Sequence, residues 1–266
     1  MAVNDILFPV VSLGGLGVTF GVLLGYASNK FAVEVDEKVG LVRECLPGAN
    51  CGGCGYAGCD AYAQAVAAGS AAANKCTPGG AAVAEKIGVV LGVSVDEAEK
   101  IVAYVKCKGT CATAKDKYNY YGVMDCRQAV IAPGGGAKAC GFGCLGLGTC
   151  VSACQFDSIQ IKDGIAQINQ DTCTGCNACV QVCPKSVIEL VPAANGVRIA
   201  CNSHEKGKVV KDNCSVGCIG CTICAKNCPE GAITMVNDLP VIDFSKCTQC
   251  KVCVAKCPTK AIADLF

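Results

Sequence analysis

The sequence has few of the large aromatic side chains with which proteins usually fill a core, and almost no histidine. Its 266 residues include no tryptophan and one histidine, and aromatic residues make up 5%. A chain of this length is large enough for one to three domains, so something other than large aromatic side chains must fill much of the interior. No constellation of a catalytic acid, base or nucleophile stands out. The net charge of +1 gives no indication of a nucleic-acid partner.

The chain also lacks the features of a small secreted protein. Dense cysteine in a short chain with a cleavable signal indicates a framework of disulfides, but this chain is long and shows no such signal. It nevertheless contains 26 cysteines. We therefore expect their thiols to lie in a reducing compartment.

Twelve of these cysteines form three copies of one run, Cys-x2-Cys-x2-Cys-x3-Cys-Pro, which begin at Cys173, Cys218 and Cys247. Bacterial ferredoxins hold [4Fe-4S] clusters with this run: three cysteines bind one cluster, and the fourth binds the other cluster of the pair. Zinc sites also use Cys-x2-Cys pairs, but usually with a dozen or more residues between two pairs. The spacing therefore predicts paired iron–sulfur clusters and electron transfer.

A fourth run, Cys140-x3-Cys144-x5-Cys150-x3-Cys154, is irregular. Aligned with the run at Cys218, it has no counterpart of Cys221, and Cys140 falls opposite Cys214. We expect Cys140 to supply the missing ligand, which leaves Cys214 redundant or free for another site.

Short β-branched segments follow the runs, as in the ferredoxin repeat, so two double-cluster domains are expected. The ligand sets expected for their four clusters are Cys140, Cys144, Cys150 and Cys183; Cys154, Cys173, Cys176 and Cys179; Cys218, Cys221, Cys224 and Cys257; and Cys228, Cys247, Cys250 and Cys253.

A further set of four cysteines precedes these runs. Cys51, Cys54, Cys59 and Cys76 lie within CGGCGYAGC and KCTPGG, where the glycines let the backbone turn tightly around a metal. We expect a fifth [4Fe-4S] cluster here, with zinc as the alternative. Residues 60–73 are rich in alanine and residues 81–106 have apolar positions at helical spacing, with a helix start at Val95-Asp96-Glu97. These helices are expected to surround the cluster.

Three cysteines between the two regions, Cys107, Cys111 and Cys126, lack a fourth partner. A sixth cluster would take Cys201 or Cys214, and Cys201 is preferred because Cys214 lies against the next run. Six sets of four would then use all the cysteines except Cys45 and one other. The alternative is that the three thiols are buried and bind nothing.

One long segment, Ile6 to Ala27, has no charged residue and as a helix would be about 33 Å long, enough to cross a bilayer once. Lys30 and Lys38 follow it and no basic residue precedes it, which predicts that the rest of the chain lies in the cytoplasm. Gly17, Gly21 and Gly25 share one helix face, which indicates either a contact with another membrane helix or the ordinary abundance of glycine in membrane helices.

Two other patterns have ordinary explanations. Gly141 to Gly146 matches G-x-G-x-x-G, but it lies inside a cysteine run and follows no strand that opens a βαβ unit, so it does not indicate a dinucleotide site. Lys206, Lys208 and Lys211 could attract an acidic electron donor, but a solvated charged loop is the preferred explanation.

The order of these motifs resembles a known family. An N-terminal glycine-rich span ends in GYASNKFAVEVDEKV, and LPGANCGGCGYAGC, CTPGGAAVAEKI and tandem ferredoxin motifs follow. Essentially the whole chain is similar to the B subunits of Rnf complexes, in a cluster-rich form. These membrane complexes couple electron transfer between reduced ferredoxin and NAD to the movement of sodium ions or protons. The resemblance implies that this chain takes electrons from soluble reduced ferredoxin and passes them to other membrane and flavin subunits, with flavin and NAD bound elsewhere.

The expected fold class is α+β, with a transmembrane helix, a small helical iron–sulfur domain and two ferredoxin-like domains of the bacterial 2[4Fe-4S] type. A membrane-anchored polyferredoxin that serves another reductase or a hydrogenase is the alternative function. The expected segments are 1–30, the anchor; 31–106, the N-terminal cluster domain; 107–135, a cysteine-rich connector; 136–200, the first ferredoxin-like domain; 201–213, a linker; and 214–266, the second ferredoxin-like domain.

Overall fold

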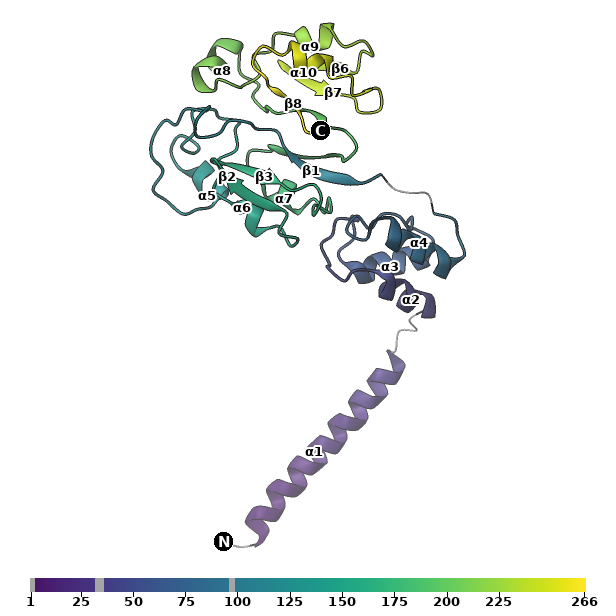
Figure 1. Ribbon diagram of the computed structural model, residues 1–266. Coiled ribbons are helices and arrows are strands. Elements are labelled where there is room, and N and C mark those ends of the chain that lie inside the picture. The colour runs from purple at the N-terminus through teal and green to yellow at the C-terminus, as the bar shows by residue number, and fades with distance from the viewer. Residues whose placement is uncertain (1–2, 32–35, 96–98) are drawn as a thin grey trace.

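The computed structural model describes residues 3–31, 36–95 and 99–266, with side chains from residue 10 onward. Three compact bodies follow a long helix, α1 (Val3–Lys30), roughly in series (Figure 1). The helical body lies next to α1, the first ferredoxin-like body follows, and the second lies at the end farthest from α1. Helices and strands are both present, which agrees with the expected α+β class.

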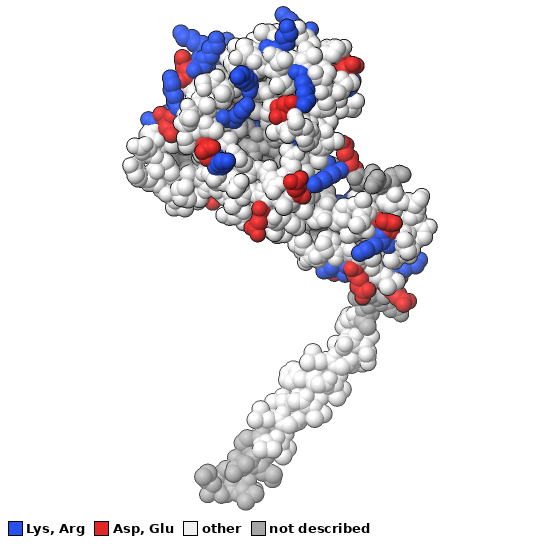
Figure 2. Space-filling model, in the orientation of Figure 1, with Lys and Arg blue, Asp and Glu red and all other residues white. Residues whose placement is uncertain are grey.

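Helix α1 extends away from the rest of the molecule as a rod without charged side chains along most of its length (Figure 2). Its segment Val10–Lys30 has a mean hydropathy of 1.8, and none of it is buried inside the protein. The helix is therefore long and apolar enough to cross a membrane once.

The helical body consists of α2 (Glu37–Cys45), α3 (Cys59–Ala67) and α4 (Gly80–Leu91). The Asp36 carboxylate caps α2 by accepting a hydrogen bond from the backbone N–H of Lys38. Tyr62 is buried between the helices, and its hydroxyl donates to the Ala72 carbonyl at 2.8 Å. The helices thus surround the loops that carry the first cysteines, as expected.

The expectation of helix over residues 81–106 fails in its last part. Helix α4 ends at Leu91 and is capped by Gly92, which has a left-handed φ of 69°. Residues Ile101–Val105, with the sequence IVAYV, form strand β1 instead, which pairs antiparallel with β4 (Ile188–Pro192). The β-branched residues and this distant partner favour the strand. Asp96 and Glu97, of the expected helix start, lie outside the described residues.

The two ferredoxin-like bodies share one topology, in which an outer strand pairs with the last strand and a hairpin lies between them in sequence. In the first body β1 pairs with β4, and the inner elements are α6 (Thr149–Ser152), β2 (Ile159–Lys162), β3 (Ile165–Ile168) and α7 (Ala178–Val182). In the second body β5 (Val197–Ile199) pairs with β8 (Ile262–Asp264), and the inner elements are α9 (Ile223–Lys226), β6 (Ile233–Val236), β7 (Leu239–Ile242) and α10 (Val252–Lys256).

The backbone repeats itself in all four cysteine runs. The residue two positions before the third cysteine is left-handed in each run: Gly148, Asn177, Thr222 and Lys251, with φ of 85°, 68°, 61° and 61°. The residue three positions after the fourth cysteine is also left-handed in each: Asp157, Ser186, Gly231 and Lys260. The irregular run therefore keeps the loop of the other three, although Leu147 stands where they carry a cysteine.

Two connections join the ferredoxin-like bodies. The first is made by the connector that runs from β1 to α5 (Cys126–Ile131). It contacts the chain just after α8 (Gly207–Asn213), where the Ser215 N–H donates to the Thr113 carbonyl at 2.9 Å. Arg198 on β5 is 1% exposed and lies over the ring of Tyr104 on β1, with 5.2 Å between the guanidinium carbon and the ring centre. Burial lowers the pKa of Arg198. These contacts hold the second body against the first.

Candidate metal centres

All 26 cysteines are free thiols, and most gather in groups. In residues 3–31, 36–95 and 99–266, no three His, Cys, Asp or Glu side chains converge closely enough to hold a single metal ion. A four-iron cluster spreads its thiolates farther apart than one tetrahedral ion does, because each thiolate binds a different iron. The groups are therefore best compared with cluster sites, in which cysteines line a cavity.

The second ferredoxin-like body contains two such cavities. One is lined by Cys218, Cys221, Cys224 and Cys257. The other is lined by Cys228, Cys247, Cys250 and Cys253. In both, the last cysteine of one run joins the first three of the other, and the two groups coincide with the sets expected from the spacing. The Ala261 N–H donates to the Cys257 sulfur at 3.3 Å, a kind of contact that tunes cluster potentials.

The first ferredoxin-like body has an equivalent group around Cys179. Burial and, to a smaller extent, the neighbouring Cys173, Cys176 and Cys154 raise the pKa of this thiol to about 12. The Ala103 N–H on β1 donates to the Cys173 sulfur at 3.4 Å. The structure thus brings together the set expected here and places β1 against it.

The remaining group of this body differs from the expected one. Burial raises the pKa of Cys150 to about 12, and its thiol neighbours are Cys144, Cys126, Cys183 and the adjacent group's Cys179. Cys126 opens α5, and its N–H donates to the Thr149 hydroxyl at 2.6 Å, which holds it beside Cys150. Cys126, rather than Cys140, therefore lies where the irregular run lacks a thiol.

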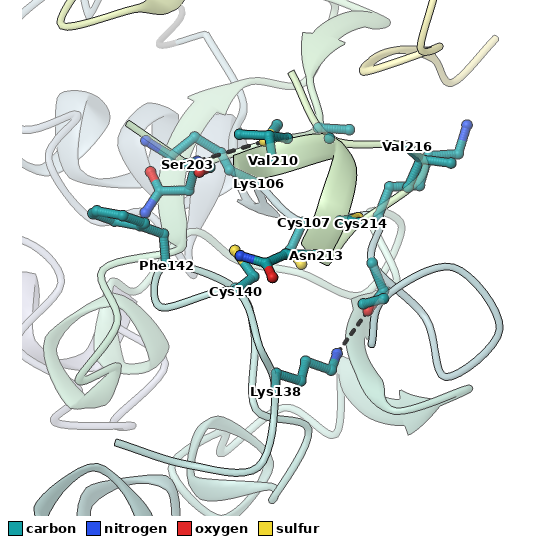
Figure 3. Close-up of a pocket in the computed structure, with 18 of the residues that line it drawn as sticks. Lys106, Cys107, Lys138, Cys140, Phe142, Ser203, Val210, Asn213, Cys214 and Val216 are labelled. Atoms are coloured by element: carbon teal, nitrogen blue, oxygen red, sulfur yellow. Dashed lines mark hydrogen bonds between the residues drawn. The ribbon is translucent and has the colours of Figure 1, made fainter. Parts of the chain in front are cut away.

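Cys140 lies in another cavity, which Cys107 and Cys214 also line (Figure 3). Cys201 is a further residue of its lining. The expected grouping of Cys107, Cys111 and Cys126 with Cys201 does not form, because Cys126 lies with Cys150 and Cys111 is exposed. The two alternatives considered for the fourth position, Cys201 and Cys214, both line this cavity.

In the helical body, Cys76 lies with Cys51, Cys54 and Cys59. Burial raises the pKa of Cys76, and those three thiols raise it further. The Asn50 side-chain oxygen accepts a hydrogen bond from the Cys59 N–H at 2.8 Å and fixes the loop ahead of α3. Cys45 stands apart, and its thiol donates to the Leu41 carbonyl at 3.3 Å.

The raised pKa values show that these thiols must lose their protons before they can bind a metal. Crowded, buried thiols keep their protons because neighbouring thiolates would repel one another and burial penalises charge. Iron ions reverse this balance, since a coordinating thiol is deprotonated. The groups of four fit [4Fe-4S] clusters, which when bound supply one-electron chemistry.

Fold and thiol groups together define an iron–sulfur electron-transfer protein with two ferredoxin-like domains. Family models agree: an Fe-S cluster model matches residues 46–78, and models of a 4Fe-4S dicluster domain match residues 141–190 and 217–261. Cys107, Cys111, Cys126, Cys140, Cys201 and Cys214 lie outside all three matches.

Comparison with curated proteins of known family identifies the family to which this chain belongs. The B subunit of the Na+-translocating ferredoxin:NAD+ oxidoreductase complex of Acetobacterium woodii is 49% identical to this chain over 247 residues, which cover 92% of this chain and 74% of that one. Its counterpart from the proton-translocating complex of Clostridium ljungdahlii is 46% identical over 92% of this chain and 86% of its own. The counterpart from the ion-translocating complex of Methanosarcina acetivorans is 45% identical over 95% and 96%. The chain belongs to the family of Rnf complex B subunits, the electron-transfer subunits of ion-translocating oxidoreductases.

Proposed function

We propose that this chain oxidises soluble reduced ferredoxin and relays its electrons, one at a time, to the membrane and flavin subunits of an Rnf complex. The observation that carries the proposal is the crossing of the fourth cysteines in the second body, which puts two cluster sites of ferredoxin type at the end farthest from α1. In each transfer ferredoxin loses one electron and a cluster of this chain gains it, and no bond breaks.

Five ligand sets supply the relay. They are Cys51, Cys54, Cys59 and Cys76; Cys154, Cys173, Cys176 and Cys179; Cys126, Cys144, Cys150 and Cys183; Cys218, Cys221, Cys224 and Cys257; and Cys228, Cys247, Cys250 and Cys253. The third set replaces Cys140 of the expected set with Cys126. Each set is proposed to hold one [4Fe-4S] cluster.

Electrons are proposed to enter at the second body and leave at the helical body. Exposed lysines lie over the second body (Figure 2), with Lys206, Lys208 and Lys211 at α8. Positive charge there would attract an acidic ferredoxin and raise its association rate. The helical body lies next to α1, so its cluster is the one closest to the membrane.

We further propose that α1 is a single-pass anchor and that the three bodies lie on the cytoplasmic side, because Lys30 and Lys38 follow the span. Flavin and NAD are proposed to bind other subunits. Phe142 and Gly143, in the segment that resembles a dinucleotide loop, line the cavity of Cys140 instead. In domain terms we assign residues 101–106 to the first ferredoxin-like domain and residues from 197 to the second, since β1 and β5 complete their sheets.

The test is to mix anaerobically purified, oxidised full-length protein with reduced ferredoxin and follow both spectra by stopped flow. We expect ferredoxin to be reoxidised while the iron–sulfur absorbance of this chain falls, at a rate that decreases with salt. A variant with glutamate at the three α8 lysines should slow the reaction without changing iron content. Absence of any electron transfer to the iron-loaded wild-type chain would reject the proposal.

A further inference from the structure

The cavity that contains Cys107, Cys140, Cys201 and Cys214 lies between the two ferredoxin-like bodies, and none of these four cysteines falls within a family-model match. Figure 3 shows the labelled Cys107, Cys140 and Cys214 around a common space. Two of the four thiols come from the first body and its connector, and two come from the second body and its leading segment.

The four positions are equivalent in pairs. Cys107 follows the last residue of β1 by two positions, and Cys201 follows the last residue of β5 by two positions. Cys140 precedes Cys144 by four positions, and Cys214 precedes Cys218 by four positions. Each body therefore contributes the same two cysteines of its repeat, and the site forms where the two copies face each other. This arrangement is what an internal duplication produces at a contact between its halves.

The sulfurs of the site accept backbone hydrogen bonds in the same equivalent way. The Cys144 N–H donates to the Cys107 sulfur at 3.4 Å, and the equivalent Cys218 N–H donates to the Cys201 sulfur. The Ser203 N–H also donates to Cys201, at 3.5 Å. Such N–H···S contacts stabilise thiolate ligands and set cluster potentials. They also connect the site directly to ligands of a cluster in each body.

Glycines keep space open between the sulfurs. A Cβ on Gly109 would lie 3.5 Å from the Cys214 sulfur and 3.7 Å from the Cys107 sulfur. A Cβ on Gly143 would lie 3.6 Å from the Cys140 sulfur and 3.8 Å from the Cys107 sulfur. Three of the four sulfurs thus share a space that a side chain at either glycine would enter.

The wall of the cavity contains a buried positive charge. Lys138 is 6% exposed, and its amino group donates to the carbonyls of Gly109 at 2.6 Å and Gly164 at 2.9 Å. Among the described residues it forms no salt bridge, and the Glu205 side chain of the cavity is exposed at its edge. A buried cation requires compensation. A cluster with four thiolate ligands carries negative charge and would provide it.

We propose that Cys107, Cys140, Cys201 and Cys214 hold a further [4Fe-4S] cluster that joins the two ferredoxin-like domains electrically. Each electron that reaches it from the cluster site of Cys218 would leave to the cluster site of Cys144, so that donor and acceptor change by one electron and no bond forms or breaks. The six sites then use every cysteine except Cys45 and Cys111. The inference rests on the proposed relay only for the direction of electron flow.

The first test is metal content in the full-length protein purified without oxygen. Wild type should contain about 24 irons and as many acid-labile sulfides per chain, whereas Cys140→Ala and Cys214→Ala should each contain about 20. Cys111→Ala is the matched control, because Cys111 lies in the same connector and is exposed, and it should retain the wild-type content. The double variant Cys140→Ala/Cys214→Ala should lose about four irons, not eight.

Three results would overturn the site: wild-type iron in Cys140→Ala and Cys214→Ala, loss of iron in Cys111→Ala, or zinc without sulfide at the site. If the single cysteine variants do not fold, Lys138→Met provides a second test. It should shift one electron paramagnetic resonance signal that Lys115→Met leaves unchanged. A wild-type chain with about 20 irons that still oxidises ferredoxin would overturn the site and leave the proposed relay intact.

Discussion

The backbone of Gly53 lies directly against the backbone of Cys176. A Cβ at position 53 would lie 3.0 Å from the Cys176 α-carbon and 3.2 Å from its carbonyl oxygen. Gly53 lies between two cysteines of the helical body's site, and Cys176 belongs to a site of the first ferredoxin-like body. Two cysteine loops therefore touch at a place where a side chain at position 53 would push against the backbone of Cys176, and this contact directly connects the helical body with the first ferredoxin-like body.

Replacing this glycine should separate the two loops. We expect Gly53→Val to retain wild-type iron and sulfide but to slow electron transfer into the helical body's cluster at least several-fold, because tunnelling falls steeply with distance. Rapid-freeze electron paramagnetic resonance after mixing with reduced ferredoxin would follow that cluster. Gly40→Val is the control, since nothing lies within 4 Å of a Cβ at Gly40. Equal rates in the two variants would contradict the assignment of this contact.

The replacement of Cys140 by Cys126 in the first ferredoxin-like domain has its own consequence. Cys126→Ala should remove the cluster site of Cys144, Cys150 and Cys183, with loss of about four irons. Because the last cysteines of the two runs cross, the partner cluster should also become labile to oxygen. Iron analysis before and after exposure to air checks this. Retention of all iron in Cys126→Ala would favour Cys140 as the fourth ligand.

Lys138 should set the potential of the cluster site that it faces. Lys138→Met removes a buried positive charge next to the cavity of Cys107 and Cys214, so reduction, which adds negative charge, becomes less favourable and one midpoint potential should fall. A redox titration monitored by electron paramagnetic resonance measures the change. Lys115→Met, at an exposed position, should leave all midpoint potentials within error because solvent screens its charge. Identical titration curves for the two variants would argue against an anionic cluster in the cavity.

Arg198 should matter for stability, although it binds no cluster in any proposed set. Arg198→Met leaves the Asn195 carbonyl without its donor, removes one of the two donors of the Pro192 carbonyl and removes the contact with Tyr104. We expect a loss of about 2–4 kcal/mol and a fall in Tm of about 5–10 °C. The Arg43–Asp60 ion pair lies at the surface and provides the comparison, and Arg43→Met should lower the free energy of unfolding much less than Arg198→Met does. Anaerobic thermal melts of both variants measure the change in Tm. Equal changes in Tm would contradict the view that Arg198 holds the two ferredoxin-like bodies together.

The anchor should be separable from the iron–sulfur bodies. Deletion of residues 2–31 should move the protein from the membrane to the soluble fraction with its iron content unchanged, since α1 is not buried against the described bodies. Protease added to inside-out vesicles should digest the bodies, and protease added outside intact spheroplasts should not. Digestion from the outside would reverse the proposed orientation, and persistence of the deleted form in the membrane would show a second attachment.

The cysteine spacing predicted the ferredoxin-like domains and both groups in the second body, because three closely spaced ligands leave the chain few ways to surround a cluster. It did not predict the exchange of Cys126 for Cys140. Sequence alignment compares neighbours along the chain, whereas Cys126 reaches Cys150 through a helix start held by Thr149. The equivalence of Cys140 and Cys214 was visible in the alignment, and it was the best available sign that these two cysteines act together.

Strand β1 could not be recognised from the sequence with the same certainty. A short apolar segment such as IVAYV is compatible with a buried helix or a strand until its partner is known. The partner β4 lies more than eighty residues later, and the Cys173 sulfur that β1 covers is also distant in sequence. Long-range pairing, rather than local pattern, decided the boundary between the helical body and the first ferredoxin-like domain.

The pairing of β5 with β8 affects how the protein is made in the cell. Strand β5 leaves the ribosome before any cysteine run of the second domain, but its partner Ile262–Asp264 is synthesised after Cys257, the final ligand. The β5–β8 pair therefore cannot form until translation has passed all the cysteines of the second domain. The outer sheet of the second domain can therefore be completed only after every thiol of that domain has been synthesised.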